Sequence, residues 1–307
     1  MDSASLNNSA SDQHQATETI SVPAEHARGR LLGIIVRVAA AAVLLLLTVA
    51  AVFAPMIAPY DTHDVDVMNS LIAPSLSNED GGFPHLLGTD SLGRDIFSAI
   101  LYGARVSLLV GVVSVVGAGL VGTVVGLVAG FFQGWVDEVI TRLADVQQAF
   151  PFILLSIFIM FILGRGLMNV IVVLIVTSWP LYARVTRAET LRLKETEFVV
   201  AARVLGAGSL RIMFWHVLPS ALTPLIVIAT FAVPQMIIFE AGLSFLGLGM
   251  PPDVVSWGSM LAGGRNHLDL GWWIATMPGI AIVLIVLSIN ILGDWLRDTL
   301  DPRMRNI

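Results

Sequence analysis

The sequence predicts an all-α polytopic membrane protein with six transmembrane helices. Of its 307 residues, 56% are hydrophobic and 13% are charged, against about 45–50% and about 25% in a typical soluble domain. The mean hydropathy of +0.82 leaves more apolar surface than one buried core can hold, so part of it must face lipid. The ten-residue alternation of polar and apolar residues that marks a membrane β-barrel is absent, which favours helices.

Six uncharged apolar runs contain the expected spans, because a helix of about 20 residues crosses the hydrocarbon core of a bilayer. The runs cover 38–57, 107–132, 146–163, 166–183, 217–239 and 271–292. The first run follows three arginines and could be the core of a signal peptide. Its length and the polar segment in front of it favour a permanent span instead.

The chain is expected to divide into four parts. Residues 1–30 are rich in Ser, Asn, Gln and Asp and are expected to form a disordered cytoplasmic tail. Residues 31–105 hold the first span and an external segment. Residues 106–293 form a five-helix core that includes a cytoplasmic loop at 184–219, and residues 294–307 form a cytoplasmic C-terminal tail.

The orientation follows from the positions of Lys and Arg between the spans. A cytoplasmic N-terminus places thirteen of the 17 basic residues inside: Arg28, Arg30, Arg37, Arg142, Arg184, Arg187, Arg192, Lys194, Arg203, Arg211, Arg297, Arg303 and Arg305. The four outside are Arg94, Arg105, Arg165 and Arg265. Both termini and the loop at 184–216 are therefore predicted to be cytoplasmic, and segments 58–105 and 240–270 to be external.

Small and polar residues within the spans allow two interpretations each. The second span carries small residues at four-residue spacing, which favours close helix packing over a hinge: Ser114, Ala118, Gly122, Gly126 and Gly130. Polar side chains mark several span boundaries, where interfacial solvation or interhelical pairing is favoured over a substrate or proton relay: Asp145, Gln147, Gln148, Glu240, Asn290 and Asp294.

Most enzymatic and nucleic-acid functions are excluded by what the sequence lacks. It has no cysteine, no nucleotide-binding loop, no HExxH or GxSxG motif and no paired histidines at metal-ligand spacing. The net charge of −6 and the dispersed basic residues give no footprint for nucleic acid. We therefore expect a protein that is not an enzyme and that binds no metal or cofactor of its own.

The cytoplasmic loop is the most distinctive stretch. Residues 186–205 are predicted to be helical, and Gly206 to break that helix. Ser209 is predicted to cap a second short helix through Trp215, which Pro219 stops before the fifth span. Two short helices meeting at a glycine would form a protrusion. Equally, the loop could lie on the membrane with its six basic residues held by anionic lipid.

This loop resembles the signature of membrane subunits of ATP-binding cassette importers, written EAA, three residues, Gly, nine residues, Ile, one residue, Leu-Pro. The matching residues have the spacing of the signature: Val200, Ala201, Ala202, Gly206, His216, Leu218 and Pro219. Val200 replaces the leading Glu and His216 replaces the Ile. A salt-bridge role for that Glu therefore cannot be transferred to this chain.

Three further stretches resemble the dipeptide/oligopeptide/nickel permease family, and its C-type membrane subunit in particular. They are LGTDSLGRDIFS at 87–98, LSFLGLGMPP at 243–252 and GDWLRDTLDPR at 293–303. The resemblance runs from the first span to the C-terminus and leaves out only the polar tail.

The resemblance implies the type I importer permease fold and ATP-driven import of short peptides or similar small solutes across the bacterial cytoplasmic (inner) membrane. The implied partners are a homologous second permease, two cytoplasmic ATPase subunits that bind ATP-Mg, and an external solute-binding protein. It also implies that the loop docks on the ATPase through the matched residues and Arg203. An ATP-independent secondary carrier or a membrane scaffold is the alternative, and the solute stays open between dipeptide, oligopeptide, nickel chelate and glutathione.

Two sets of residues carry functional expectations. A bulky residue at Gly206 is expected to clash, and a charge at Ala201 or Ala202 to oppose docking. In the external stretch, Thr89, Asp90 or Ser91 is expected to cap a helix beginning near Leu92, with Asp95 in its first turn and Arg94 paired with a carboxylate. This helix would guard the outer mouth or contact the solute-binding protein, although a purely structural helix is the alternative.

Overall fold

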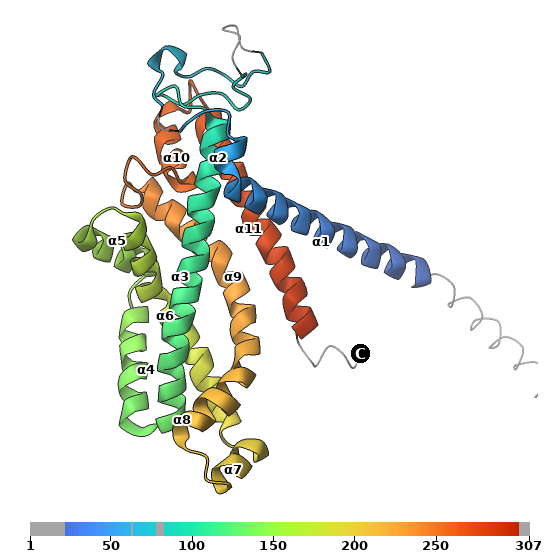
Figure 1. The fold of residues 1–307 in the computed structure, drawn as a ribbon, viewed down its shortest axis with the longest axis vertical. Helices are drawn as coiled ribbons and strands as arrows, with labels where there is room; N and C mark the ends of the chain where they lie inside the picture. Colours follow the sequence, from blue (N-terminus) through green and yellow to red (C-terminus); the bar gives the residue numbers. More distant parts are fainter. Residues whose placement is uncertain (1–21, 63, 78–82, 301–307) are drawn as a thin grey trace, which may run out of the picture.

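The computed structural model describes residues 22–62, 64–77 and 83–300, and it is a helical bundle with no β-strand in this part of the chain (Figure 1). Within these described residues, five helical segments are long and apolar enough to cross a membrane. They are Leu32–Val52 of α1 (Val22–Val52), α3 (Ile96–Phe132), α6 (Leu167–Leu193), Ser209–Phe245 with α9 (Leu218–Phe245), and α11 (Trp273–Leu300).

The third predicted span, 146–163, is interrupted. α4 (Gly134–Gln148) and α5 (Phe152–Leu163) pass the span test only as a pair, and they are bent by 93° at the break between them. The prediction of one continuous helix over 146–163 is wrong. Pro151 stands immediately before α5 and has no N–H to donate to the preceding turn, which ends α4.

Helix ends also differ from the predicted part boundaries. α1 begins at Val22, inside the predicted tail 1–30, whose residues 1–21 lie outside the described part of the chain. α3 begins at Ile96, before the predicted boundary at 105, and α11 extends to Leu300, inside the predicted tail 294–307, whose residues 301–307 are also outside the described part. An apolar run predicts only the part of a helix that lies in lipid. The helix can extend beyond that run, because its backbone hydrogen bonds form equally well between polar residues.

The small residues of α3 form a packing face, as predicted, and not a hinge. A Cβ atom added at Gly122 would lie 2.5 Å from the Trp179 carbonyl oxygen and 2.6 Å from the Tyr182 Cβ atom, both on α6. Val110 of α3, Leu174 of α6 and the α9 side chains beside them share one buried core. Close backbone approach therefore holds the central helices together.

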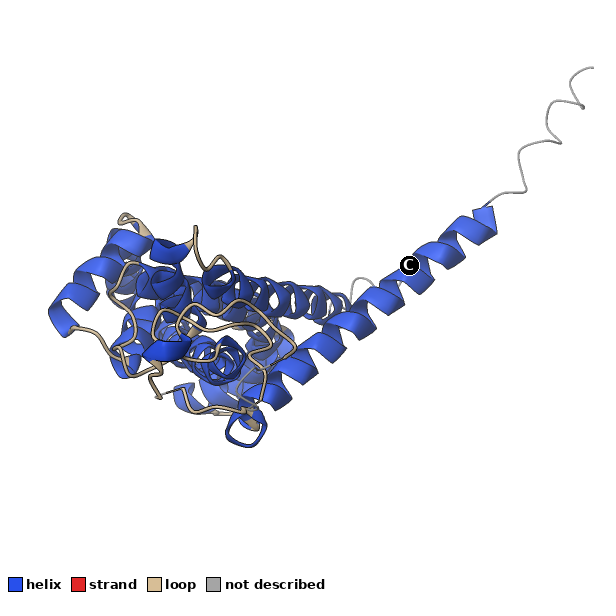
Figure 2. Ribbon diagram, turned by 90° about the horizontal axis from the view of Figure 1, so that it is seen from above, coloured by secondary structure: helices blue, strands red, loops and turns tan. Residues whose placement is uncertain are grey.

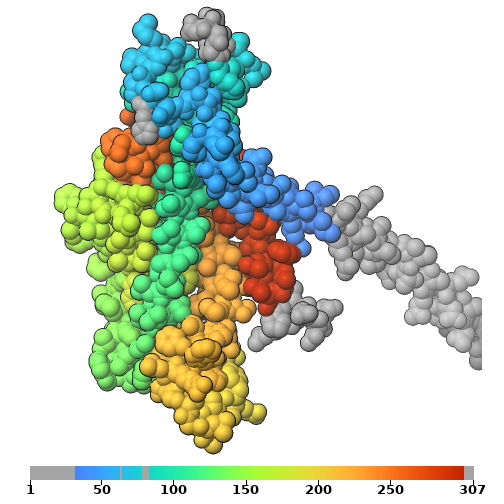
Figure 3. All heavy atoms as spheres, in the orientation of Figure 1, coloured from blue at the N-terminus to red at the C-terminus, as the bar shows by residue number. Residues whose placement is uncertain are grey.

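The short elements lie at opposite ends of the bundle. The segment between α2 (Ala54–Ile57) and α3 lies at one end together with α10 (Trp257–Gly264) (Figure 1). α7 (Glu197–Val204) and α8 (Ser209–Ile212) form the other end (Figures 1 and 3). The two segments predicted to be external therefore share one end, opposite the predicted cytoplasmic loop, and α1 leads obliquely away from the bundle (Figure 2).

Candidate coupling loop and external pocket

The turn at Gly206 ends α7 with a well-formed cap. Gly206 has a φ of +84°, a left-handed conformation that glycine adopts without a Cβ penalty. Its N–H donates to the carbonyl oxygen of Arg203, and the Ala207 N–H donates to that of Ala202, each at 3.0 Å. This pair of bonds is a Schellman motif, which satisfies the last carbonyl groups of the helix.

The rest of the loop differs from the predicted pair of separate helices. The helix predicted over 186–205 is interrupted, because α6 ends at Leu193 and α7 begins at Glu197. α8 continues through a π-helical turn, Met213–Val217, directly into α9. Pro219 therefore lies in the first turn of α9, where a missing N–H is tolerated, and does not end the preceding helix. Ser209 is inside α8, and Gly208 is the N-cap residue.

The predicted coupling residues lie on an accessible part of the loop. Val200, Ala201, Arg203, Gly206 and Pro219 are exposed, while Ala202, His216 and Leu218 are half-buried. A Cβ atom at Gly206 would meet nothing within 4 Å, so the expected clash does not occur within this chain. Substitution there is opposed by the left-handed backbone conformation instead.

Large apolar side chains protrude beside these residues. We define the loop surface as Val204, Leu205, Leu210 and Trp215, whose exposed fractions are 82%, 87%, 67% and 79%. Beneath it, Val199, Ile212 and the neighbouring apolar side chains form a separate buried core that holds α7 and α8 against the ends of α3 and α6. The loop surface is therefore a supported apolar protrusion.

Most of the basic residues of the loop have acidic partners in the same chain. Arg184 pairs with Asp145 at 2.5 Å, and Arg187 forms a two-pronged ion pair with Asp137. Arg192 pairs with Glu189 at 2.7 Å, and Lys194 lies 4.0 Å from Glu195. Four of the six cations that could have bound anionic lipid are thus already neutralised by nearby carboxylates.

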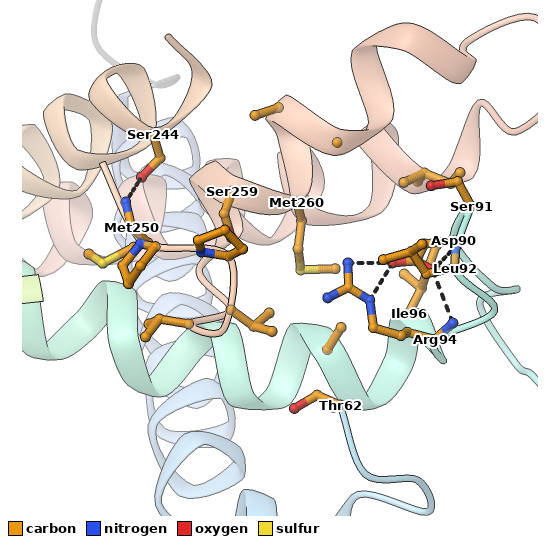
Figure 4. A pocket seen from close by; sticks show the side chains of 18 of the residues that line it. Thr62, Asp90, Ser91, Leu92, Arg94, Ile96, Ser244, Met250, Ser259 and Met260 are labelled. Atoms are coloured by element: carbon orange, nitrogen blue, oxygen red, sulfur yellow. Dashed lines mark hydrogen bonds and ion pairs between the residues drawn. The ribbon is translucent and has the colours of Figure 1, made fainter. Parts of the chain in front are cut away.

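At the other end of the bundle lies a pocket of about 310 Å³ (Figure 4). Asp90 and Arg94 form one side of it, and Met250, Met260 and Ser259 line another side (Figure 4). The Arg94 Nε atom donates to the Asp90 carboxylate at 2.8 Å, so the predicted pairing of Arg94 with a carboxylate is confirmed. The pocket is mainly apolar, with this ion pair on one side.

No helix begins near Leu92. Asp90 instead closes a turn by accepting from the N–H groups of Leu92 at 2.8 Å and Arg94 at 3.0 Å. Asp95 is the N-cap of α3, accepting from the Ser98 N–H at 2.8 Å, and its second oxygen lies 3.0 Å from His85 Nδ1. Gly93 favours this turn because its φ is +77° and Asp66 lies directly against it.

The structure separates the four predicted external residues into two pairs. Thr89 is buried, donates to the Asn69 carbonyl oxygen at 2.6 Å and accepts from the Ile72 N–H at 2.8 Å. Asp95 is also buried, so these two side chains stabilise the external segment, whereas Asp90 and Arg94 line the pocket.

One residue that lines the pocket was not predicted from the sequence. Arg165 lines the pocket from the short connection between α5 and α6, and its position between two glycines was the only local signal. Glu240 is fully buried and accepts from the hydroxyl groups of Ser107 at 3.3 Å, Ser244 at 2.8 Å and Ser256 at 2.8 Å. These contacts join α3, α9 and α10, so the interhelical pairing predicted for Glu240 is what the structure shows.

Within 22–62, 64–77 and 83–300, no three His, Cys, Asp or Glu side chains are grouped to hold a metal ion.

Residues 122–306 match the family model described as the binding-protein-dependent transport system inner membrane component. Residues 36–74 match the N-terminal transmembrane domain of oligopeptide transport permease C. The chain belongs to this permease family. It is a membrane-spanning subunit of an ATP-binding cassette importer, and ATP hydrolysis is the work of a separate subunit.

Individual relatives cover most of the permease. The di/tripeptide transport system permease protein DppC of Pseudomonas aeruginosa is 44% identical over 263 residues, which is 86% of each chain. The glutathione transport system permease protein GsiD of Pectobacterium atrosepticum is 42% identical over 88% of each chain. Among solved structures, the inward-facing methionine transporter MetNI matches with a TM-score of 0.54 and 21% identity, covering 66% of this permease and 96% of that chain. This last match shows the shared type I importer fold.

Proposed function

We propose that this permease carries short peptides or similar small solutes inward across the bacterial cytoplasmic (inner) membrane, with both termini in the cytoplasm. Its partners in this proposal are a homologous second permease, two cytoplasmic ATPase subunits and an external solute-binding protein. ATP-Mg is bound by the ATPases, and this chain binds no cofactor. The relatives' names support the solute class, because they include di/tripeptides and glutathione, which carry amide groups.

The loop surface is the observation that carries the proposal. Exposed apolar side chains of this size at the end of a membrane bundle are typical of a protein docking site. Binding to anionic lipid is less well supported, because four of the six basic residues already have acidic partners. We infer that the ATPase covers Leu205 and Trp215, next to Ala201 and Gly206.

A single substitution tests this docking. Ala202 is half-buried beside the exposed face of α7, and a carboxylate there would have to lose its hydration when the ATPase docks. Ala202→Glu should therefore insert in the membrane at the wild-type level yet recover at least about tenfold less ATPase, since about 1.4 kcal/mol changes association tenfold. The measurement is pull-down of the ATPase together with solute uptake.

The matched control is Gln133→Glu, which adds the same charge at the same end of the bundle, at an exposed position outside the loop surface. It should leave both quantities unchanged. Wild-type ATPase recovery with Ala202→Glu would contradict the proposed docking site. Uptake that continues after mutation of the nucleotide-binding lysine of the ATPase would instead favour an ATP-independent carrier.

A further inference from the structure

The break between α4 and α5 lies beside the middle of the apolar part of α6. Gln147, the penultimate residue of α4, donates its amide to the carbonyl oxygens of Val176 at 2.9 Å and Thr177 at 3.1 Å on α6. Pro180 leaves the Val176 carbonyl without its helical partner, and Gln147 supplies the replacement. Val176 is ten residues from Gly166 and eight from Arg184, about 15 Å and about 12 Å along a helix.

The three residues of this break, Ala149, Phe150 and Pro151, are all exposed, and the first turn of α5 has no side-chain cap. The N–H groups of Ala149 and Phe150 already donate to Asp145 and Gln147, so the carbonyl groups of these two residues are the backbone groups that a ligand could use. Non-helical backbone at membrane depth is not stable against lipid, and it occurs only where protein covers it or water reaches it. A groove of about 360 Å³ lies beside it, with Gln148, Phe150 and Leu155 among its lining residues.

A second exposed amide lies on the helix next to this groove. Gln235 of α9 is exposed, and its neighbour Met236 accepts from Ser178, one residue after Thr177, so Gln235 lies at the depth of the break. Phe239, one turn further along the same face of α9, stacks on Phe152 at a centroid distance of 3.9 Å. The stacked rings therefore join the α5 start to the helix face that carries Gln235.

We propose that this polar strip, defined as Gln148, Gln235 and the carbonyl groups of Ala149 and Phe150, lines the solute path and hydrogen-bonds the main-chain amides of a short peptide. Within the described part of the chain, neither carboxamide has a hydrogen-bond partner. A carboxamide both donates and accepts, as a peptide group does, so the strip recognises the main chain whatever side chains the peptide carries. Because the strip is uncharged, it does not hold the solute by ion pairs and so allows release.

The inference rests on the proposed function, and the cysteine-free chain allows a direct test. Gln148→Cys and Gln235→Cys are assembled with the ATPase and treated with 2-sulfonatoethyl methanethiosulfonate, which reacts with thiolates in water. Both should be modified, and alanyl-alanine should slow the modification. Leu46→Cys on the lipid-exposed face of α1 is the control and should stay unmodified.

Two further variants test the hydrogen bonds. Gln148→Leu and Gln235→Leu keep the side-chain volume roughly constant and should each reduce alanyl-alanine uptake about tenfold with unchanged ATPase recovery. If Gln148→Cys does not assemble, Phe150→Cys samples the same groove. If the wild-type complex imports alanyl-alanine but the two cysteines stay unmodified, this inference is overturned and the proposed function is not. That result would indicate that protein covers the break. Failure of the wild-type complex to bind the ATPase would overturn the proposed function.

Discussion

Gly206 and Asp95 show how single residues shape the two candidate sites. The left-handed turn at Gly206 sets the angle between α7 and α8, and therefore the arrangement of the loop surface. Asp95 begins α3 and also holds His85, so it fixes the external segment next to the pocket. Both roles depend on backbone geometry, because a Schellman turn and an N-cap each satisfy groups that a helix end leaves unpaired.

Gly206→Ala should weaken the α7–α8 turn by about 1–2 kcal/mol, because an L side chain is disfavoured in the left-handed region. The effect should come from the backbone alone, since the added Cβ atom has open space. Gly206→Asn should be milder because asparagine tolerates this conformation better. Limited proteolysis of the loop in the assembled transporter measures the effect. Equal cleavage of the Ala and Asn variants would argue against the backbone explanation.

Asp95→Ala should lower the stability of the external end by about 0.5–2 kcal/mol through loss of the N-cap, and it also leaves His85 unpaired. Asp95→Asn retains a capping oxygen and should lose less. Thermal unfolding of the purified permease in detergent compares the two variants. The same midpoint for both would show that the cap contributes nothing at this position.

At the scale of the elements, the contact between α3 and α6 depends on how closely the backbones approach. Gly122 lies against the Trp179 carbonyl, whereas Gly119, three residues earlier, has only the Tyr182 ring within 4 Å. Polar contacts join other pairs of helices: Arg187 of α6 pairs with Asp137 of α4, and the buried Glu240 of α9 contacts serines at α3 and α10. The bundle therefore combines a dry, close contact at its centre with polar contacts toward its ends.

The two glycines give a matched pair of variants. Gly122→Ala should destabilise the permease by about 1–3 kcal/mol, because the new methyl group can be accommodated only if α3 and α6 move apart. Gly119→Ala places its Cβ atom 3.6 Å from the Tyr182 ring, an ordinary contact, and should have little effect. Unfolding midpoints in detergent decide between them, and equal midpoints would mean that the α3–α6 distance does not limit stability.

At the scale of the whole molecule, the two ends of the bundle should face different compartments. The predicted coupling loop and the pocket lie at opposite ends (Figure 1), and most Lys and Arg residues of the sequence fall in the segments predicted to be cytoplasmic. The orientation with the loop in the cytoplasm stays a prediction of the positive-inside rule.

Single cysteines test this orientation. Ser91→Cys, at an exposed position of the pocket, should react with a membrane-impermeant thiol reagent added to intact cells, and Ser209→Cys in the exposed α8 should react only after the cells are opened. The unsubstituted, cysteine-free chain provides the background. Labelling of Ser209→Cys from outside, with Ser91→Cys protected, would reverse the assigned topology.

The sequence by itself determined the membrane class, the approximate positions of the apolar spans and the loop with its turn at Gly206. These features are local, because an apolar run long enough to span and a glycine needed for a left-handed turn are visible within a short stretch. The spacing of the loop motif and the three further stretches was enough to indicate the permease family.

Only the tertiary structure decided which of these residues meet. It buried Thr89 and Asp95, placed Asp90 and Arg94 at the pocket, and brought Gln235 to the depth of the α4–α5 break. It also interrupted the third span, which apolar content could not indicate because hydropathy measures contact with lipid and not helix direction. Such outcomes depend on contacts between residues far apart in the chain, and packing of the assembled helices selects among arrangements that are locally equivalent.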